Sequence, residues 1–552
     1  MNKSYYYWLN PVCFGDFIEA TIVANSRRKI INFVIDQSAG MNIKILISLV
    51  FVFSFLFAGA QSDEPVRIEI NTQPETDVYK VIPCGEKGVL VFYQSVDRFD
   101  ELHTTWVFTL FNTRLEQVWT REVPVLSDAR YVEYAGYGEQ LYLLFYIDGN
   151  IKKGALNVQL LAFNNTSEQF MSMYGRVEEK SEFIDMEAWN EKVFLGFNKR
   201  KYEIGFYMAD FTSSAFSHID LSLDERNLVE DIYLDKPNKR IAIIVNHFIS
   251  KKQSYLLLKY FNDEGNLLQS IAVRAEDPDI SLNAAKLIVL SADKALLIGS
   301  YNNEAAHSSG LKEAETISAG IFSSLIVNGE PGRINLYNFI DFRNFSSYMQ
   351  VPRLIKYKRK EKNNPEKEFS LNYRLLPHDI VKKDSQYVFL TEAYYPEYRT
   401  VSYISYDYYG RPYPQTYTVF DGYKYFGGIV TAFDQSGKLL WENGIKIWNI
   451  QSFRLEKKVE AFFDNSDLVL AYVSEGRLAS EIYSSGNTVG DFEYTDLQTK
   501  YRRDRIIDEQ GSNIEKWYGK YFLVYGYQEI KNNALAEQNK RNVFYMNKIA
   551  FE

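Results

Sequence analysis

The sequence predicts an all-β fold, a β-propeller of about eight four-stranded blades, with seven blades as the alternative. Aromatic residues make up 16% of the 552 residues, with 42 Tyr and 38 Phe, and such rings fit the pleated, half-buried surface of a strand. Apolar runs of strand length recur along the chain, together with hairpin signals spaced by about 50 residues, the period of a four-stranded blade.

The apolar runs are the first part of this repeat. Continuous apolar stretches of this length are typical of inner strands that are packed on both faces. Eight of them occur, at residues 88–93, 140–145, 192–197, 240–245, 294–299, 386–390, 467–472 and 520–525.

The hairpin signals are the second part. In the two clearest copies, residues 258–268 and 430–441, an Asn- or Asp-containing turn ends in Gly265 or Gly437. Glycine at that point supplies the positive φ that a short hairpin loop needs. Weaker copies lie at residues 108–119, 161–170, 208–211, 325–329 and 481–486.

The last repeat lacks one strand, because the chain stops after the segment 542–550. Residues 66–70, Val-Arg-Ile-Glu-Ile, alternate correctly to supply it. Since a free edge strand is a pairing hazard, we expect this N-terminal strand to close the ring within a propeller spanning residues 65–552. The alternative is two β domains divided near residue 345.

The N-terminal region predicts export. Residues 41–60 combine Lys44, an apolar core at 45–57 and the small residues Ala58-Gly59-Ala60, the three parts of a secretory signal peptide. We expect cleavage after Ala60 and a secreted or periplasmic protein of the cell envelope, without a stable membrane anchor. Residues 1–40 are interpreted as an artefactual or non-structural extension preceding a true start at Met41, with a long signal n-region or a retained anchor as the alternatives.

Charge and cysteine content set further limits. The formal net charge is -9, which argues against a nucleic-acid-binding protein because such proteins need a concentrated basic face. Cys13 precedes the expected cleavage site, so the exported chain carries only Cys84 and can form no intramolecular disulfide. Cys84 is expected in a buried strand.

Two insertions interrupt the repeat. Residues 339–374 contain a basic stretch at 353–362, which we interpret as a solvated face. Residues 392–426 hold the densest aromatic cluster of the chain. Tyr-rich loops give rigid contact area and hydroxyl groups for sugars or peptides, although an extra hairpin that packs its own rings fits the same composition.

Residues 378–380, 392–399, 408–412, 419–423 and 433–442 resemble a family of uncharacterised secreted proteins from Bacteroidetes. The resemblance covers the C-terminal half and extends toward the whole exported chain. It implies an exported location and no known activity. In that family the stretch matching 426–428 is closer to Thr-His-Ala, so one His is absent here, which puts any shared His-based chemistry in doubt.

No catalytic or metal-binding signature is present in the sequence. The five His residues show no metal-ligand spacing, and no cysteine pair is available for zinc. No nucleophile elbow, P-loop or dinucleotide fingerprint occurs, so no cofactor and no metal are expected. The adjacent His378 and Asp379, and the carboxylates Glu392 and Glu397, are the strongest candidates for acid–base chemistry, but a structural role is the preferred interpretation of both pairs.

We therefore expect a non-enzymatic binding or scaffold protein whose ligand is a protein or glycan of the cell envelope. A hydrolase or lyase acting on polysaccharide, with its site near His378 and Glu392, is the alternative. Carboxylates in a deep central pocket would favour the enzyme, and a flat tyrosine surface the binding protein. The candidate binding residues are His378, Glu392, Tyr394, Tyr395, Tyr398, Arg399, Tyr408, Tyr409, Arg411 and Tyr423.

Overall fold

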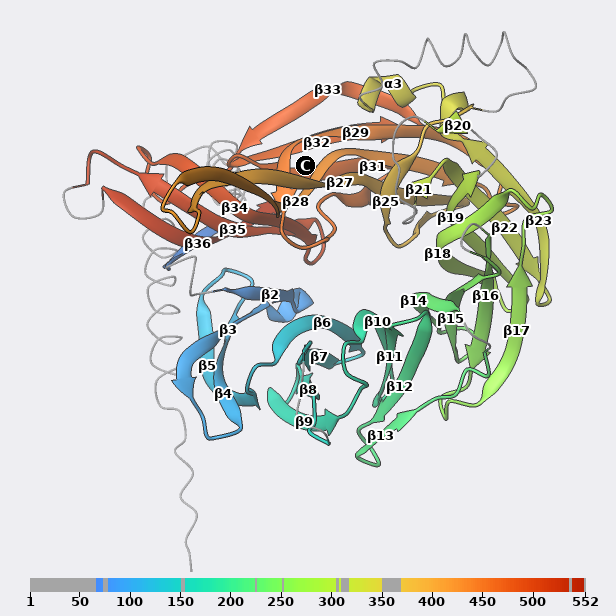
Figure 1. The fold of residues 1–552 in the computed structure, drawn as a ribbon, viewed down its shortest axis with the longest axis horizontal. Coiled ribbons are helices and arrows are strands. Elements are labelled where there is room, and N and C mark those ends of the chain that lie inside the picture. Colours follow the sequence, from blue (N-terminus) through green and yellow to red (C-terminus); the bar gives the residue numbers. More distant parts are fainter. Residues whose placement is uncertain are drawn as a thin grey trace, which may run out of the picture. The chain divides into compact units, whose positions relative to one another are not determined.

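The repeated apolar runs form strands that assemble into consecutive antiparallel sheets (Figure 1). The computed structural model describes residues 66–72, 78–149, 154–223, 226–250, 253–303, 307–308, 317–349, 369–535 and 539–550. The predicted extension, the signal peptide and the basic stretch at 353–362 lie outside these residues. Within them, no helix is both long and apolar enough to cross a bilayer.

Seven sheets of the described structure have four strands. In six of them the strands lie side by side in chain order, and in the seventh the N-terminal strand pairs with the C-terminal strand. The first three are β2 (Lys80–Pro83), β3 (Val89–Arg98), β4 (His103–Phe111), β5 (Gln117–Leu126); β6 (Arg130–Tyr137), β7 (Gln140–Tyr146), β8 (Val158–Asn164), β9 (Gln169–Gly175); and β10 (Glu182–Trp189), β11 (Lys192–Lys199), β12 (Glu203–Asp210), β13 (Ala215–His218). The next two are β14 (Asn227–Asp235), β15 (Arg240–Phe248), β16 (Ser254–Phe261), β17 (Leu267–Val273); and β18 (Ile280–Ser291), β19 (Lys294–Asn303), β22 (Gly320–Val327), β23 (Glu330–Asn338).

The C-terminal third completes the set. A six-stranded sheet holds β21 (Ile317–Ser318), β25 (Tyr373–Pro377), β26 (Val381–Lys383), β27 (Gln386–Tyr406), β28 (Pro412–Phe433) and β29 (Leu439–Ser452). It is followed by β30 (Glu460–Asp464), β31 (Asp467–Ser474), β32 (Arg477–Ser484), β33 (Asn487–Asp496), and by β34 (Arg505–Lys516), β35 (Tyr521–Lys531), β36 (Lys540–Ala550) with β1 (Val66–Asn71). Minor elements are the parallel pair β20 (His307–Ser308) and β24 (Phe369–Ser370), the 3-10 helices η1 (Gly85–Lys87) and η2 (Phe339–Asp341), and helix α3 (Phe345–Tyr348).

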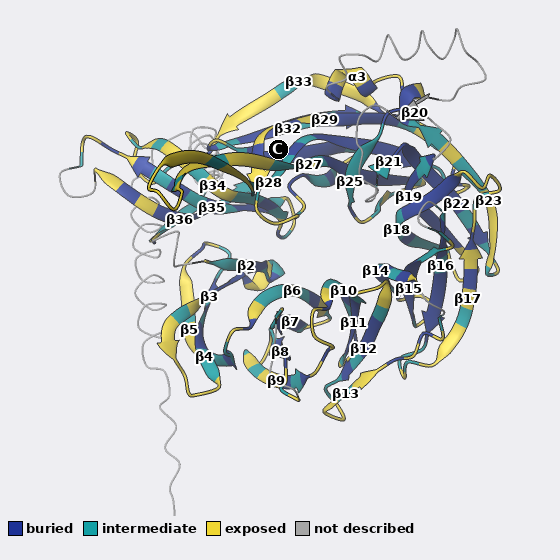
Figure 2. Cartoon of the chain, in the orientation of Figure 1, coloured by how far each residue is buried: buried dark blue, intermediate teal, exposed yellow. Residues whose placement is uncertain are grey.

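This order confirms the predicted all-β propeller architecture and the role of both sequence signals. The apolar runs form the second strand of each large sheet, between the first and the third. The predicted hairpins join third and fourth strands, and Gly265 and Gly437 have φ values of +81° and +79°. Figure 2 shows the consequence for burial, since the second strands are mostly buried and outermost strands such as β13, β17 and β33 are mostly exposed. Residues 65–552 form one compact unit, without a division near residue 345.

Neighbouring sheets pack through apolar clusters, and tyrosine has a special role between them. Tyr142 and Tyr146 on β7 bury their rings, and their hydroxyl groups donate to the carbonyls of Asn190 and Ser181 in the next sheet, both at 2.9 Å. Tyr483 on β32 likewise donates to Gly444 on β29, at 2.7 Å. A buried ring whose polar tip is hydrogen-bonded combines hydrophobic area with satisfied polarity, which gives part of the high tyrosine content a structural cause.

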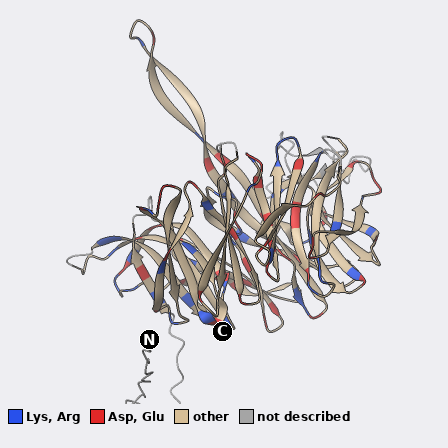
Figure 3. Ribbon diagram, turned by 90° about the horizontal axis from the view of Figure 1, so that it is seen from below, with Lys and Arg blue, Asp and Glu red and all other residues tan. Residues whose placement is uncertain are grey.

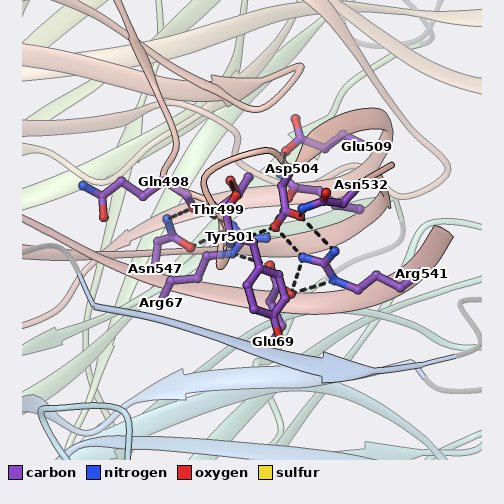
Figure 4. A network of polar contacts seen from close by, with 11 residues as sticks. Arg67, Glu69, Gln498, Thr499, Tyr501, Asp504, Glu509, Asn532, Arg541 and Asn547 are labelled. Atoms are coloured by element: carbon purple, nitrogen blue, oxygen red, sulfur yellow. Dashed lines mark hydrogen bonds and ion pairs between the residues drawn. The ribbon is translucent and has the colours of Figure 1, made fainter. Parts of the chain in front are cut away.

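The first and last strands pair. All six residues of β1 align antiparallel with β36, from Val66 opposite Lys548 to Asn71 opposite Val543. A buried charge network links them to the preceding loop (Figure 4). Glu69 accepts from Arg67 at 2.8 Å and from Arg541 at 2.9 Å, and Arg541 also contacts Asp504 at 2.5 Å. Because each buried charge has a partner of opposite sign, the desolvation cost is offset.

Candidate functional site

The most unusual element of the described structure is the hairpin of β27 and β28, with strands of 21 and 22 residues. At its base the sheet continues on both sides, since β25 pairs with β27 up to Tyr394 and β29 pairs with β28 from Tyr423 onward. Among the described residues, β27 from Tyr395 onward pairs only with β28, and β28 before Tyr423 pairs only with β27. We call residues 395–422 the arm. Figure 3 shows it projecting from the body as a two-stranded ribbon.

The tip of the arm is a well-defined turn. The Asp407 side chain accepts hydrogen bonds from the backbone N–H groups of Tyr409 at 2.9 Å and Arg411 at 2.8 Å. Gly410 takes a φ of +73°, a conformation that favours glycine. This local turn sets the register of the hairpin. It leaves Tyr408 and Tyr409 96% and 79% exposed.

The strand register divides the arm into two faces, because residues directly opposite each other share a face. One face carries Tyr398, Phe420, Ile404 and Tyr406 with a band of Thr and Ser residues between them; the other carries Val401, Tyr403, Tyr413 and Tyr417. Ring contacts agree, since Tyr398 lies 5.7 Å from Phe420 and Tyr403 lies 5.7 Å from Tyr417 between ring centroids. Neither face is covered by another described element, so both present aromatic rings to solvent.

Charges on the arm are largely neutralised within it. Arg399 contacts Asp421 at 3.1 Å, and Glu397 lies 3.9 Å from Lys424 at the base. Arg411 is placed 5.9 Å from the ring of Tyr409 and forms no ion pair within the described part of the chain. The arm is therefore a nearly neutral surface of rings and hydroxyl groups.

Tyr394 and Tyr423 belong to the base of the hairpin, and Tyr395 is the first residue of the arm, at its junction with the base. Tyr394 packs edge-on against Tyr423 at 5.6 Å, and both contact the core between this sheet and the next. Tyr395 is exposed and lies 5.8 Å from Phe426. These residues anchor the arm.

His378 and Glu392 are brought together, but inside the protein. His378 Nε2 lies 2.6 Å from Glu392 Oε1, and the same oxygen accepts the backbone N–H groups of Lys458 at 2.7 Å and Val459 at 2.9 Å. Glu392 is fully buried. The pair joins the arm-bearing sheet to the segment that enters β30, so its clearest role is to hold two sheets together. Glu397 lies apart from it, beside Lys424.

A second feature is a central cavity of about 1870 Å³, whose lining residues were not identified together as a site from the sequence. Residues of the first strand of each sheet line it, from β2, β6, β10, β14, β18, β25, β30 and β34. Twelve Asp or Glu side chains and five Lys or Arg side chains face it. The available sequence signal was an acidic residue in the strand before an apolar run, as at Glu133, Asp185 and Asp231.

The cavity perturbs its carboxyl groups. Burial raises the pKa of Glu460 to about 7, helped by the negative charge of Glu515. Burial likewise raises the pKa of Glu515 to about 7 and that of Glu230 to about 7, and it raises the pKa of Glu133. Glu133 is solvent accessible, yet the surrounding walls displace most of the bulk water that would stabilise its charge.

Lysines balance one side of the cavity. Lys286 contacts Asp231 at 2.5 Å and Asp379 at 2.9 Å, and Lys457 contacts Asp379 at 3.2 Å. These cations hold the pKa of Asp379 below its usual range although burial acts in the opposite direction. Within the described residues, no group of three or more His, Cys, Asp or Glu side chains is placed to hold a metal ion.

The structure thus contains both features that the sequence offered as alternatives, an exposed tyrosine surface and carboxyl groups in a central cavity. No family model matches the chain. No curated protein matches it either.

Solved structures similar to the chain include the polysaccharide lyase Uly1, with 9% identity and a TM-score of 0.37 over 76% of this chain and 89% of that one. The β-propeller domain of the Trilobed protease from Pyrococcus furiosus has 10% identity and a TM-score of 0.30 over 76% and 93%. Oligopeptidase B from Leishmania major has 8% identity and a TM-score of 0.36 over 84% and 54%. Similarities this low say nothing about activity.

Proposed function

We propose that this protein is a non-enzymatic binding protein of the cell envelope and that its arm binds an extended, uncharged polysaccharide. The observation that carries the proposal is the arm itself, a ribbon with exposed tyrosines on both faces. Monomeric proteins rarely expose contiguous apolar surface without a partner. A hairpin without a further strand or helix to cover it is also marginally stable alone, so a ligand on its faces would stabilise it.

The faces, rather than the edges, are the better binding surface. Pro396, Pro412 and Pro414 lie on the arm's strands, and proline lacks the N–H group that strand addition requires. The internal ion pairs leave little net charge to attract a charged partner. What remains are rings and hydroxyl groups, which suit the apolar faces and hydroxyl groups of sugars.

The expected setting follows from the N-terminal signal and from the resemblance of residues 378–442 to secreted proteins of Bacteroidetes. An exported protein without a membrane anchor meets envelope or environmental polysaccharides directly. We therefore place the protein in the periplasm or outside the cell. The body of the propeller would serve as a rigid base that holds the arm away from other surfaces.

Affinity electrophoresis tests this proposal. The protein would be run in native gels containing starch, mannan, laminarin or hydroxyethylcellulose, next to the variant Tyr403→Ser/Tyr417→Ser. Each exposed ring is worth about 0.5–1.5 kcal/mol in stacking, so losing two should weaken retardation by roughly tenfold. Tyr494→Ser is the matched control, since Tyr494 and Tyr403 are both 46% exposed and only Tyr403 is on the arm. Failure of all four polysaccharides to retard the wild type, or equal retardation of the arm variant, would contradict the proposal.

The cavity carboxyl groups favour a second candidate function, a hydrolase or lyase acting on polysaccharide. A carboxyl group with a pKa of about 7 can donate or accept a proton at neutral pH. The reacting groups would be Glu460 and Glu515, because Glu392, the partner of His378, is fully buried and bound by the backbone N–H groups of Lys458 and Val459. Release of reducing ends from the same polysaccharides would support it if Glu515→Gln abolished that release. The absence of release by the wild type would count against it.

A further inference from the structure

We infer that the central cavity binds an organic polycation, a ligand with two or more primary ammonium or guanidinium groups. The cavity has room for such a molecule, and its walls carry twelve acidic side chains against five basic ones. This inference is independent of the arm and its ligand.

The excess of carboxyl groups is only partly neutralised by the protein, through the pairing of Asp421 with Arg399 and of Glu475 with Arg477. Glu133 on β6, Glu460 on β30 and Glu515 on β34 form no ion pair within the described residues. They repel one another, since Glu515 raises the pKa of Glu460 and Glu133 raises that of Glu515, in both cases after burial. Three carboxyl groups from three separate sheets therefore face a common space without an ion-pair partner among the described residues, and Glu515 accepts a hydrogen bond from the Tyr525 hydroxyl.

The ion pairs of three basic side chains of the cavity are made with other acidic groups, although Lys457 and Lys458 also act at longer range on Glu460 and Glu515. Lys286 is used by Asp231 and Asp379, and Lys457 by Asp379. Lys458 contacts Glu456 at 3.2 Å. Burial lowers the pKa of Lys80, and the positive charges of Arg454 and Lys458 lower it further. The positive charge is thus gathered near β2 and the segment before β30, and a bound cation would meet the carboxyl groups of β6, β30 and β34.

A second observation also indicates a polar ligand. Ser300 and Ser318 line the same cavity although they are only 4% and 2% exposed. Neither hydroxyl group forms a hydrogen bond to the described part of the chain. Buried hydroxyl groups are normally hydrogen-bonded, so these two are available to a ligand in the cavity or to water around it.

Binding should be coupled to proton release. The carboxyl groups of Glu460 and Glu515, with pKa values of about 7, are partly protonated at neutral pH, and a cation favours their ionised form. The charged or titratable groups that act on them are Glu133, Glu456, Lys457, Lys458, Lys516 and Tyr525. Affinity should therefore rise as pH increases through the neutral range.

Isothermal titration calorimetry with tetralysine tests the inference, with spermine as the second probe. At low salt we expect one site per chain and binding about tenfold or more tighter near pH 8 than near pH 6. Glu460→Gln/Glu515→Gln should weaken binding by at least about tenfold. The control Glu139→Gln/Glu529→Gln removes the same charge outside the cavity and should change affinity by less than about twofold. Circular dichroism checks folding, and Glu133→Gln is the substitute if the double variant does not fold.

Each result has a defined meaning. Binding of both probes supports recognition of the ammonium groups themselves, and binding of only one supports the inference and identifies peptide or polyamine as the source. No binding of either probe overturns it, as does an equal loss in the cavity and control variants. The Tyr403→Ser/Tyr417→Ser variant should bind tetralysine like the wild type, so failure of the polysaccharide proposal is distinguishable from failure of this one.

Discussion

Removing Arg541 should destabilise the protein more than any exposed charge substitution on the same strand. Its guanidinium is 6% exposed and contacts Glu69 and Asp504, whose side chains are 3% and 0% exposed. In Arg541→Ala, Asp504 loses its only cation within the described structure, while Glu69 keeps Arg67. Leaving a buried charge without its partner costs about 3–5 kcal/mol, and we expect this loss in the free energy of unfolding.

Urea denaturation followed by tryptophan fluorescence gives the measurement. Lys540→Ala is the control, because Lys540 is the neighbouring residue on β36, is 62% exposed and pairs with Glu529 at 3.0 Å. An exposed pair of this kind contributes less than about 1 kcal/mol. Nearly equal losses for the two variants would refute the reasoning that the network stabilises the pairing of β1 with β36.

The same substitution has a pH signature. Burial alone would raise the pKa of Asp504, but hydrogen bonds from Arg541 and Asn532 lower it below its usual value. A lowered pKa in the folded state contributes stability that is present above the unfolded value of about 3.9 and is lost as pH falls through the folded value. The difference between wild type and Arg541→Ala should therefore shrink below about pH 4.

Three further predictions concern other parts of the propeller. Burial raises the pKa of the Cys84 thiol to about 12, so Ellman's reagent should label it only after unfolding, and rapid labelling of the native protein would contradict its burial. Gly88→Ala should cost more than about 2 kcal/mol in urea denaturation, because its φ is +124° and a Cβ would overlap the Phe111 carbonyl, whereas Gly138→Ala, with open space around it, should cost less. Glu515→Gln should stabilise the protein by on the order of 1–3 kcal/mol near pH 8. Burial raises the pKa of Glu515 from 4.5 to about 7, so the folded wild type loses stability as pH rises between these values. Thermal melts should show that the gain vanishes near pH 4, and a gain that did not change with pH would contradict this explanation.

The repeat of strands was predictable because local physics produces it. An apolar run such as 140–145 must be covered on both faces, and Gly265 or Gly437 must take a positive φ, whatever the rest of the chain does. The pairing of Val66–Asn71 with β36 could also be predicted from the sequence, because the last repeat lacks one strand and residues 66–70 have the right alternation to supply it.

The candidate site could be predicted from the sequence only in part. The aromatic density of 392–426 pointed to the arm, but not to a continuous hairpin with strands of 21 and 22 residues, because its many Tyr, Pro and Gly residues suggested loops. His378 and Glu392 were both among the candidate residues, but the sequence grouped His378 with Asp379 and Glu392 with Glu397, whereas the structure joins His378 to Glu392. Only their burial and the backbone donors of Lys458 and Val459 show that they hold two sheets together.

The sequence by itself determined the all-β class, the order of the strands and the concentration of tyrosine in one segment, since periodicity and composition act over a few residues. The tertiary structure alone decided which side chains meet. Glu133 lies 327 positions before Glu460, Glu515 lies 55 positions after Glu460, and each is an ordinary acidic residue in its own strand. They become a site only because the first strands of the sheets surround a common cavity, where loss of water and mutual repulsion change their chemistry.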